Sequence, residues 1–263
     1  MNNIQADKVI IGNNVTIEPS AKIRGINGNA RQIIIGDNTY IGSDVQIICD
    51  DFSIGDFSKI QHHTNIHGYK PCSIGHNAWI GQYTIIDSIG GVTIGDNCGI
   101  GAHSQLWSHI KFGDTLEGCR FLEEKPLDIG KDVWFVGHCI VSPIQAMDRS
   151  MALAGSVVTK NMEYNQIYAG APAKSISEKA GFQFREVTVM DKLNKMELYL
   201  QNFTSNTQLI KIITDKAEIN WKDGISYFNV TDRTYTKKGS EIEIGFMRYL
   251  LPDKAKFTPI STL

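Results

Sequence analysis

Large aliphatic residues recur at every sixth position over the first two thirds of the chain, and polar or turn-forming residues separate them. Six units begin with the pair Ile-Gly, and a large apolar residue returns six and twelve positions after each isoleucine. The three sets are Ile11, Ile35, Ile54, Ile74, Ile94 and Ile129; Ile17, Ile41, Ile60, Ile80, Ile100 and Phe135; and Ile23, Ile47, Ile66, Ile86, Leu106 and Val141. A period of six excludes an amphipathic helix, whose apolar stripe recurs at three and four residues.

The hexapeptide pattern predicts short strands joined by tight turns, with one large side chain per strand pointing inward. Residues such as Gly36, Asp37 and Asn38 accept the positive φ angles that sharp corners need. Three strands complete one coil, and stacked coils pair their strands in parallel, so that β-branched side chains form internal ladders. We therefore predict an all-β fold, a parallel β-helix of about seven coils, in a domain of residues 1–180. A seventh coil fits the pattern more loosely, with Met147, Leu153 and Thr159.

One long interruption breaks the repeat. Successive units start 24, 19, 20, 20, 35 and 18 residues apart, and the step of 35 separates Ile94 from Ile129. Because the third strand of that coil starts at Leu106, about sixteen residues, from Ile110 to roughly Lys125, loop out directly after His109. A long insertion in a regular repeat generally lies on the functional face of a solenoid.

The repeat ends near residue 176, and residues 181–263 predict a small α+β unit. Apolar residues at helical spacing indicate a helix, at Val189, Leu193, Met196 and Leu200. The segment 188–191 before it resembles a capping box. We expect this helix to cover the open end or side of the solenoid, whose last coil would otherwise expose a sheet edge. Strand-like segments follow at 209–213, 225–228 and 242–244.

The composition narrows the function classes. The 263 residues include 26 basic and 28 acidic side chains, and a net charge of −2 gives no basic footprint for nucleic acid. No apolar run approaches the roughly 18 residues of a membrane span, and the polar start is not a secretory signal. The five cysteines form no CxxC pair, so we expect reduced core residues in a cytoplasmic protein and no metal.

The most specific signals lie in the last coils. Residues 129–134 read Ile-Gly-Lys-Asp-Val-Trp, residues 154–160 read Ala-Gly-Ser-Val-Val-Thr-Lys, and residues 168–174 read Tyr-Ala-Gly-Ala-Pro-Ala-Lys. With the repeat over roughly residues 8–176, they resemble the hexapeptide-repeat acyltransferases, in the branch of maltose, galactoside and polysaccharide O-acetyltransferases. The resemblance implies a left-handed β-helix, against the usual right-handed crossover rule. It also implies acetyl-CoA as co-substrate and a homotrimer with active sites between neighbouring solenoids.

The same resemblance suggests two catalytic residues. Members of this branch place a catalytic histidine just before an excursion and a tryptophan on the next coil. The matching residues are His109, which ends Leu-Trp-Ser-His at 106–109, and Trp134. His109 would act as a general base, since an imidazole titrates near neutral pH. Trp134 precedes the inward Phe135, so we expect it at a corner or facing outward.

The resemblance also suggests where coenzyme A would bind. Gly155 and Ser156 would let the cofactor approach the backbone closely and donate N–H groups to its pantetheine amides. Lys160 and Lys174 are candidates for its phosphates, although lysines at coil ends are usually just solvated. Gly170 and Ala171 would belong to a loop that closes over the adenine end.

Stacking of the coils adds three candidates for acceptor contacts. Trp107, Asp87 and His67 each follow the third inward residue of adjacent coils by one position. We therefore expect them to form a column on one outer face, beside His109. A surface column of polar residues is also compatible with simple solvation.

The segment 61–67, Gln-His-His-Thr-Asn-Ile-His, raises a zinc alternative. It resembles the γ-type carbonic anhydrases, which share the solenoid and bind zinc through three histidines. His62 and His67 have a suitable spacing for two of these ligands. The third ligand lies upstream in that family, and no histidine precedes His62 here, so this alternative is the weaker one.

Three functional hypotheses remain. The first is an acetyl-CoA-dependent O-acetyltransferase that acts on a sugar or a cell-surface polysaccharide. The second is an N-acyltransferase that acts on a nucleotide-linked amino sugar; several such enzymes carry an N-terminal nucleotide-binding domain, whereas the repeats here begin by residue 11. The third is a non-catalytic scaffold with residues 181–263 as its binding module. The start of the repeats by residue 11 favours the O-acetyltransferase.

Overall fold

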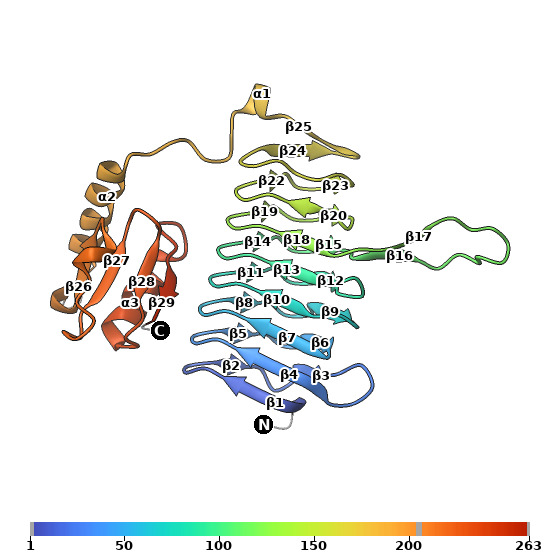
Figure 1. The fold of residues 1–263 in the computed structure, drawn as a ribbon, viewed down its shortest axis with the longest axis horizontal. Helices are drawn as coiled ribbons and strands as arrows, with labels where there is room; N and C mark the ends of the chain where they lie inside the picture. The colour runs from blue at the N-terminus through green and yellow to red at the C-terminus, as the bar shows by residue number, and fades with distance from the viewer. Residues whose placement is uncertain (1–2, 204–206, 262–263) are drawn as a thin grey trace. The chain divides into compact units, whose positions relative to one another are not determined.

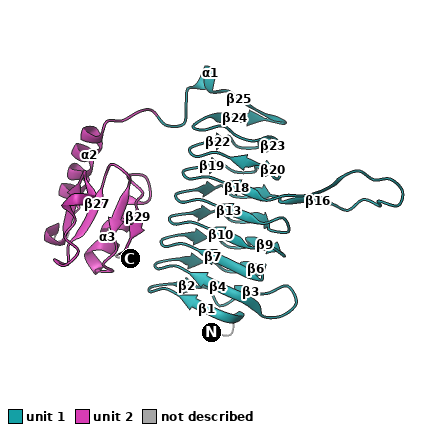
Figure 2. Ribbon diagram, viewed as in Figure 1, with its two compact units in different colours: residues 1–184 teal, residues 185–263 magenta. Residues whose placement is uncertain are grey.

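The chain divides into two compact units, residues 1–184 and residues 185–263 (Figure 2). The computed structural model describes residues 3–203 and 207–261. Within these ranges, no helix combines the length and the apolar character that a membrane crossing requires.

The first unit is a parallel β-helix with three walls (Figure 1). The first wall contains β4 (Ala30–Ile35), β7 (Asp51–Ile54), β10 (Cys72–Ile74), β13 (Val92–Ile94), β18 (Leu127–Ile129) and β21 (Gln145–Ala146). The second contains β2 (Thr16–Ile17), β5 (Tyr40–Ile41), β8 (Lys59–Ile60), β11 (Trp79–Ile80), β14 (Gly99–Ile100), β19 (Trp134–Phe135), β22 (Met151–Ala152) and β24 (Ile167–Gly170). The third contains β3 (Lys22–Arg24), β6 (Gln46–Cys49), β9 (Asn65–Gly68), β12 (Ile85–Asp87), β15 (Gln105–Leu106), β20 (Ile140–Val141) and β23 (Val157–Val158).

The two ends of the solenoid depart from this order. At the start, β1 (Ile4–Ile11) pairs with both β3 and β4 and so joins the first and third walls. At the other end, β25 (Ala173–Ser175) folds back antiparallel on β24, and α1 (Ser177–Ala180) follows.

The residues that the sixfold period selected form the core. Register pairs Ile80 with Ile100 and Ile100 with Phe135 in the second wall, and the other two walls repeat this alignment. Most members of the three sets are almost fully buried, while Ile11 and Ile17 in the N-terminal coil are half-buried. The predicted inward positions are therefore confirmed from the second to the sixth unit. Burial of these side chains is the main stabilising term of the solenoid.

The coil after Val141 has a different register from the predicted one. Ala146, Ala152 and Val158 pair with the inward residues of the preceding coil and are buried. The expected trio began at Met147, which is 43% exposed. The prediction was wrong by one residue because alanine does not stand out as a large apolar position.

Three corners connect the walls, and we number them by the walls they join: first to second, second to third, and third to first. At the first corner, a Cβ on Gly36 would lie 2.5 Å from Asp56 Oδ1 of the next coil, so only glycine fits. The positive φ falls two residues later, on Asn38. Glycine is thus required for close approach of the coils, and asparagine supplies the left-handed turn.

The second unit contains two long helices and a four-stranded sheet. Helix α2 (Val189–Asn202) begins where predicted, with the Thr188 side chain accepting the Asp191 N–H. The sheet order is β26 (Ile210–Ile213), β27 (Ser226–Asn229), β28 (Thr234–Thr236) and β29 (Thr258–Ile260), with short 3₁₀ turns at Thr207–Leu209 and Lys216–Glu218. The expected strand at 242–244 is instead the start of α3 (Glu241–Leu250), because Ser240 caps a helix that buries Phe246 and Leu250.

Replacing Ile100 with alanine tests the ladder account of the core. Ile100 is fully buried between Ile80 and Phe135, so Ile100→Ala should lower the free energy of unfolding by about 2–5 kcal/mol. Urea titration of the solenoid's circular dichroism measures this change. Thr93→Ala, on the exposed face of the first wall, is the control and should change stability little. Equal midpoints for the two variants would contradict the account.

Candidate active site

The interruption of the repeat is an antiparallel hairpin that projects from the third corner (Figure 1). Its strands are β16 (His109–Lys111) and β17 (Leu122–Glu124). Glu124 Oε1 lies 2.9 Å from Lys70 Nζ, and Glu124 Oε2 lies 3.5 Å from Lys111 Nζ. The hydrogen bond from Lys70 is the main reason that the pKa of Glu124 is lowered. The base of the hairpin is therefore fixed to a coil below it.

His109 stands at this base and pairs with a buried carboxylate. Its Nδ1 lies 2.7 Å from Asp87 Oδ2, and Asp87 is only 4% exposed. Since an ionised carboxylate only accepts hydrogen bonds, Nδ1 carries the proton and Nε2 of the neutral ring is left as a base. His109 itself is half-buried at the base of the hairpin.

Ser108 completes the network around Asp87. Its backbone N–H and its hydroxyl both donate to Asp87 Oδ2 at 2.9 Å, and the Gly90 N–H donates to Ser108 Oγ at 2.8 Å. Three donors, counting His109, thus converge on one carboxylate oxygen in a buried setting. Such charge-assisted bonds are about twice as strong as neutral ones, so they fix the orientation of the imidazole.

Asp87 and its neighbours differ from the predicted outer column. Asp87 and His67 are register partners, as expected, but Asp87 is buried against Ser108 and His109. His67 is exposed, and its ring centroid lies 6.5 Å from that of Tyr69. Trp107 is half-buried, with its ring centroid 6.3 Å from His109. Sequence reasoning missed Ser108, although its place directly before His109 was the available signal.

Trp134 lies on the second wall, whereas His109 lies at the third corner. Trp134 faces outward from β19, with 45% of its surface exposed. A Cβ on Gly99 would come within 3.1 Å of its Cδ1, so the indole covers that glycine of the coil below. Gly99 therefore sets the position of the Trp134 ring.

The expected cofactor residues lie at the second corner and at the top of the solenoid. Gly155 has φ +74, and nothing lies within 4 Å of the place where its Cβ would be. Its N–H donates to Gly137 O, and the Ser156 N–H and hydroxyl donate to Leu153 O. These N–H groups are thus engaged within the corner, so the expected donation to pantetheine amides has no free donor here. The remaining candidates, Lys160, Gly170, Ala171 and Lys174, are exposed.

His109 and Gly155 are at different corners of the same chain. The third wall separates the second corner, with Gly155, from the third corner, with His109. Successive corners are six residues apart in sequence, an edge of roughly 15–20 Å at about 3.3 Å per extended residue. One chain therefore does not bring these two groups together.

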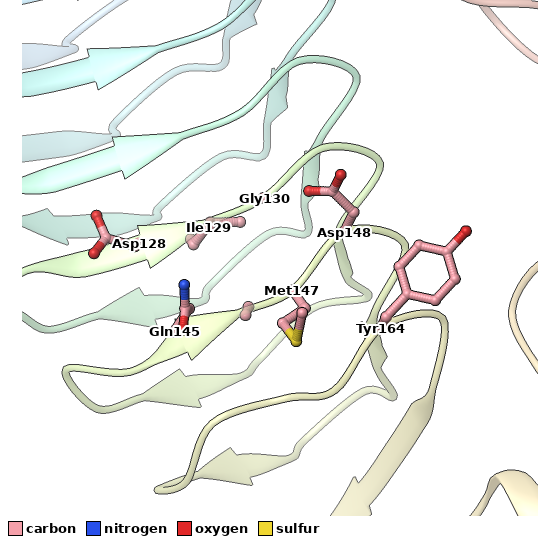
Figure 3. Close-up of a pocket in the computed structure, with 8 residues that line it drawn as sticks. Asp128, Ile129, Gly130, Gln145, Met147, Asp148 and Tyr164 are labelled. Atoms are coloured by element: carbon pink, nitrogen blue, oxygen red, sulfur yellow. The ribbon is translucent and has the colours of Figure 1, made fainter.

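A separate pocket lies at the first corner, near the top of the first wall (Figure 3). It encloses about 320 Å³, and its lining includes Asp128, Gln145, Met147, Asp148 and Tyr164. None of the residues predicted for the active site lines it. Across residues 3–203 and 207–261, no group of three or more His, Cys, Asp or Glu side chains could hold a metal ion.

Comparisons with known proteins give relatives in sequence and in structure. No family model matches the chain. The chain is 34% identical over 122 residues to galactoside O-acetyltransferase from Escherichia coli, covering 44% of this chain and 55% of that protein. It is 25% identical over 191 residues to the bifunctional protein GlmU from Acaryochloris marina, covering 65% of this chain and 40% of that protein. The chain thus spans about half the length of these relatives.

A solved structure is also similar to the chain. It is AntD, an N-acyltransferase from Bacillus cereus in complex with dTDP and 3-hydroxybutyryl-CoA, with 17% identity and a TM-score of 0.48. The match covers 76% of this chain and 93% of that one. The match in sequence to galactoside O-acetyltransferase confirms the resemblance to the hexapeptide-repeat acyltransferases that the motifs of the last coils indicated.

Proposed function

We propose that the protein is an acetyl-CoA-dependent O-acetyltransferase that acts on a hydroxyl of a sugar or a cell-surface polysaccharide. The observation that carries this proposal is the His109–Asp87 pair at the base of the hairpin, with its contact at 2.7 Å. The similarity to galactoside O-acetyltransferase supports a hydroxyl acceptor. We place the reaction in the cytoplasm, because the five free cysteines suit a reducing compartment.

His109 serves as the base in this scheme. Its Nε2 removes the proton of the acceptor hydroxyl while the oxygen attacks the carbonyl carbon of the thioester. As the carbon–sulfur bond breaks, the imidazolium returns the proton to the leaving sulfur, and the products are an acetyl ester and a free thiol. Asp87 stabilises the imidazolium, and Ser108 holds Asp87 in place. Trp134 lines the site in this scheme.

Gly155 supports passage of coenzyme A along the second corner. Its missing side chain leaves open space beside the backbone, which a larger residue would fill. We assign Ser156 to the same segment only by its position beside Gly155, since its N–H and its hydroxyl both donate to Leu153 O. The exposed Lys160 and Lys174 provide charge for phosphates, and Gly170 and Ala171 form the turn at the adenine end. His67 and Trp107 remain our candidates for acceptor contacts.

We further infer a homotrimer in which each site forms between two copies. His109 and Gly155 belong to different corners, so a second copy must supply the cofactor segment that faces His109. The hairpin supports this, because it carries an exposed apolar set that a monomer would leave in water: Ile110, Phe112, Leu116, Phe121 and Leu122. A left-handed β-helix of about seven coils is the geometry we propose for each copy.

Loss of the base should abolish most of the rate. We expect His109→Ala to lower kcat by about 10²–10⁴, with little change in KM for acetyl-CoA. Thiol release from acetyl-CoA, measured with a panel of monosaccharides, oligosaccharides and amino sugars, gives both constants. The wild-type protein should release thiol faster with hydroxyl acceptors than with amines. Release at the background rate with every acceptor would contradict the proposed activity and favour a scaffold.

Removing the charge of Asp87 should have a smaller effect. Asp87→Asn keeps the shape but weakens the charge-assisted bond to His109, so kcat should fall roughly 10- to 100-fold. The same thiol-release assay measures the change. Asp128→Asn, an exposed aspartate on the first wall, is the matched control and should retain the wild-type rate. Similar rates for Asp87→Asn and the control would remove Asp87 from the mechanism.

Shortening the hairpin should dissociate the assembly. Replacing residues 112–121 with a two-residue turn removes most of its exposed apolar side chains while retaining the β16–β17 pairing. Light scattering should give a trimer for the wild-type protein and smaller species for the variant. A monomeric wild-type protein would contradict the homotrimer.

A further inference from the structure

Four aromatic rings are stacked at the second corner, outside every role assigned above. They belong to His63, Tyr83, His103 and His138, and we call them the ring ladder. Successive centroids are 4.8, 5.0 and 4.8 Å apart, and the ring planes deviate by 19°, 7° and 15°. All four side chains are exposed. Each follows the second inward residue of its coil by three positions, a regularity that sequence reasoning overlooked.

The backbone under the ring ladder is in the left-handed conformation. All four have positive φ, between 51 and 58°. Asparagine, aspartate and histidine are enriched in this conformation, whereas it is rare for a bulky residue such as Tyr83. At the first corner, Phe57, Asp132 and Arg149 occupy three of the equivalent positions, and asparagine occupies the other five: Asn14, Asn38, Asn77, Asn97 and Asn165. The second corner differs in that four successive coils all place a ring at this position and stack it on the next, which points to a use for the rings.

The ring ladder ends at the proposed cofactor segment. The His138 N–H donates to Ala102 O, and the Gly155 N–H donates to Gly137 O of the next coil down, so Gly155 is the next position in the column. Gly155 has no side chain and open space around it. The ring ladder therefore begins next to the expected position of coenzyme A and extends toward the N-terminal coils. An acceptor that lies along the ladder would have one end near the thioester.

We propose that the ring ladder binds the saccharide acceptor as an extended chain of several sugar units. Because each inner ring is covered on both faces by its neighbours, the ladder presents mainly ring edges to solvent. Imidazole and phenol groups both donate and accept hydrogen bonds, which matches the hydroxyl groups of a polyol. A flat nucleobase would need a free ring face, and only the two terminal rings, His63 and His138, have one in the ladder. Polysaccharide therefore fits the ladder better than a nucleotide. This inference rests on the proposed acetyltransferase activity.

The test compares acceptors of different length. Tyr83→Asn with His103→Asn removes the two inner rings and installs the residue that fills the same backbone position at the first corner, so folding should be preserved. Thiol release is measured with glucose, maltose and maltohexaose. For the wild-type enzyme, kcat/KM should rise from glucose to maltohexaose. In the double variant, kcat/KM for maltohexaose should be roughly tenfold lower than in the wild-type enzyme. Its kcat/KM for glucose and its KM for acetyl-CoA should stay unchanged.

Tyr164→Asn is the matched control, because Tyr164 is an exposed tyrosine near the first corner. It should keep the full dependence on chain length. An active wild-type enzyme that shows no gain with chain length overturns the proposal, as does a double variant that keeps the gain. Acetylation of a nucleotide-linked sugar alone overturns it too. Absence of thiol release with every acceptor instead removes the proposed function itself.

Discussion

Hydrogen bonding between parallel coils is the constraint on which the rest of the first unit depends. It holds each residue directly above its counterpart in the coil below, at the strand separation of about 4.8 Å. Side chains of one type that recur at equivalent positions of successive coils therefore contact one another. Isoleucines form the interior ladder, carboxylates such as Asp56 and Asp96 accept N–H groups of the neighbouring coil at the first corner, and the ring ladder follows the second.

The same constraint builds the candidate active site. Asp87 and Ser108 lie on adjacent coils, so the carboxylate meets the backbone and hydroxyl of Ser108 without any loop to bring them together. The hairpin begins one residue later and carries His109 out of the regular wall while leaving its ring against Asp87. The regular repeat thus fixes the His109–Asp87 pair, and the hairpin leaves the histidine half-buried. Stacking also confines Gly155 to another corner, which is why we propose that a second copy completes the site.

Much of the fold could be predicted because its period is explicit in the sequence. The walls, the core residues and the position of the hairpin all follow from counting by six. The prediction failed at Ala146 and Ala152, where small residues hide the inward positions. It also failed at residues 242–244, where a strand-like run of isoleucine and glutamate begins a helix capped by Ser240. Propensity alone does not distinguish a strand from a helix at residues 242–244, because the packing of Phe246 and Leu250 decides between them.

The candidate site was harder to predict than the fold. The break in the repeat led to His109. The sequence does not show which side chains are buried, so Asp87 was predicted on the outer face as an acceptor contact, whereas it is buried. Ser108 was missed for the same reason, and the engaged N–H groups of Gly155 and Ser156 are visible only in the geometry of the corner. The ring ladder was missed because its members are far apart in sequence and each alone is an ordinary surface residue.

Subunit complementation tests most directly the central claim that His109 of one copy acts on a thioester held at Gly155 of another. His109→Ala removes the base, and Gly155→Trp fills the open space at a corner that accommodates large rings in the coils below. Each variant alone should be nearly inactive. Trimers that assemble randomly from equal amounts of both should recover about one quarter of the wild-type rate, since that share of interfaces pairs two intact halves. Mixed trimers without activity, verified by native mass spectrometry, would contradict the claim.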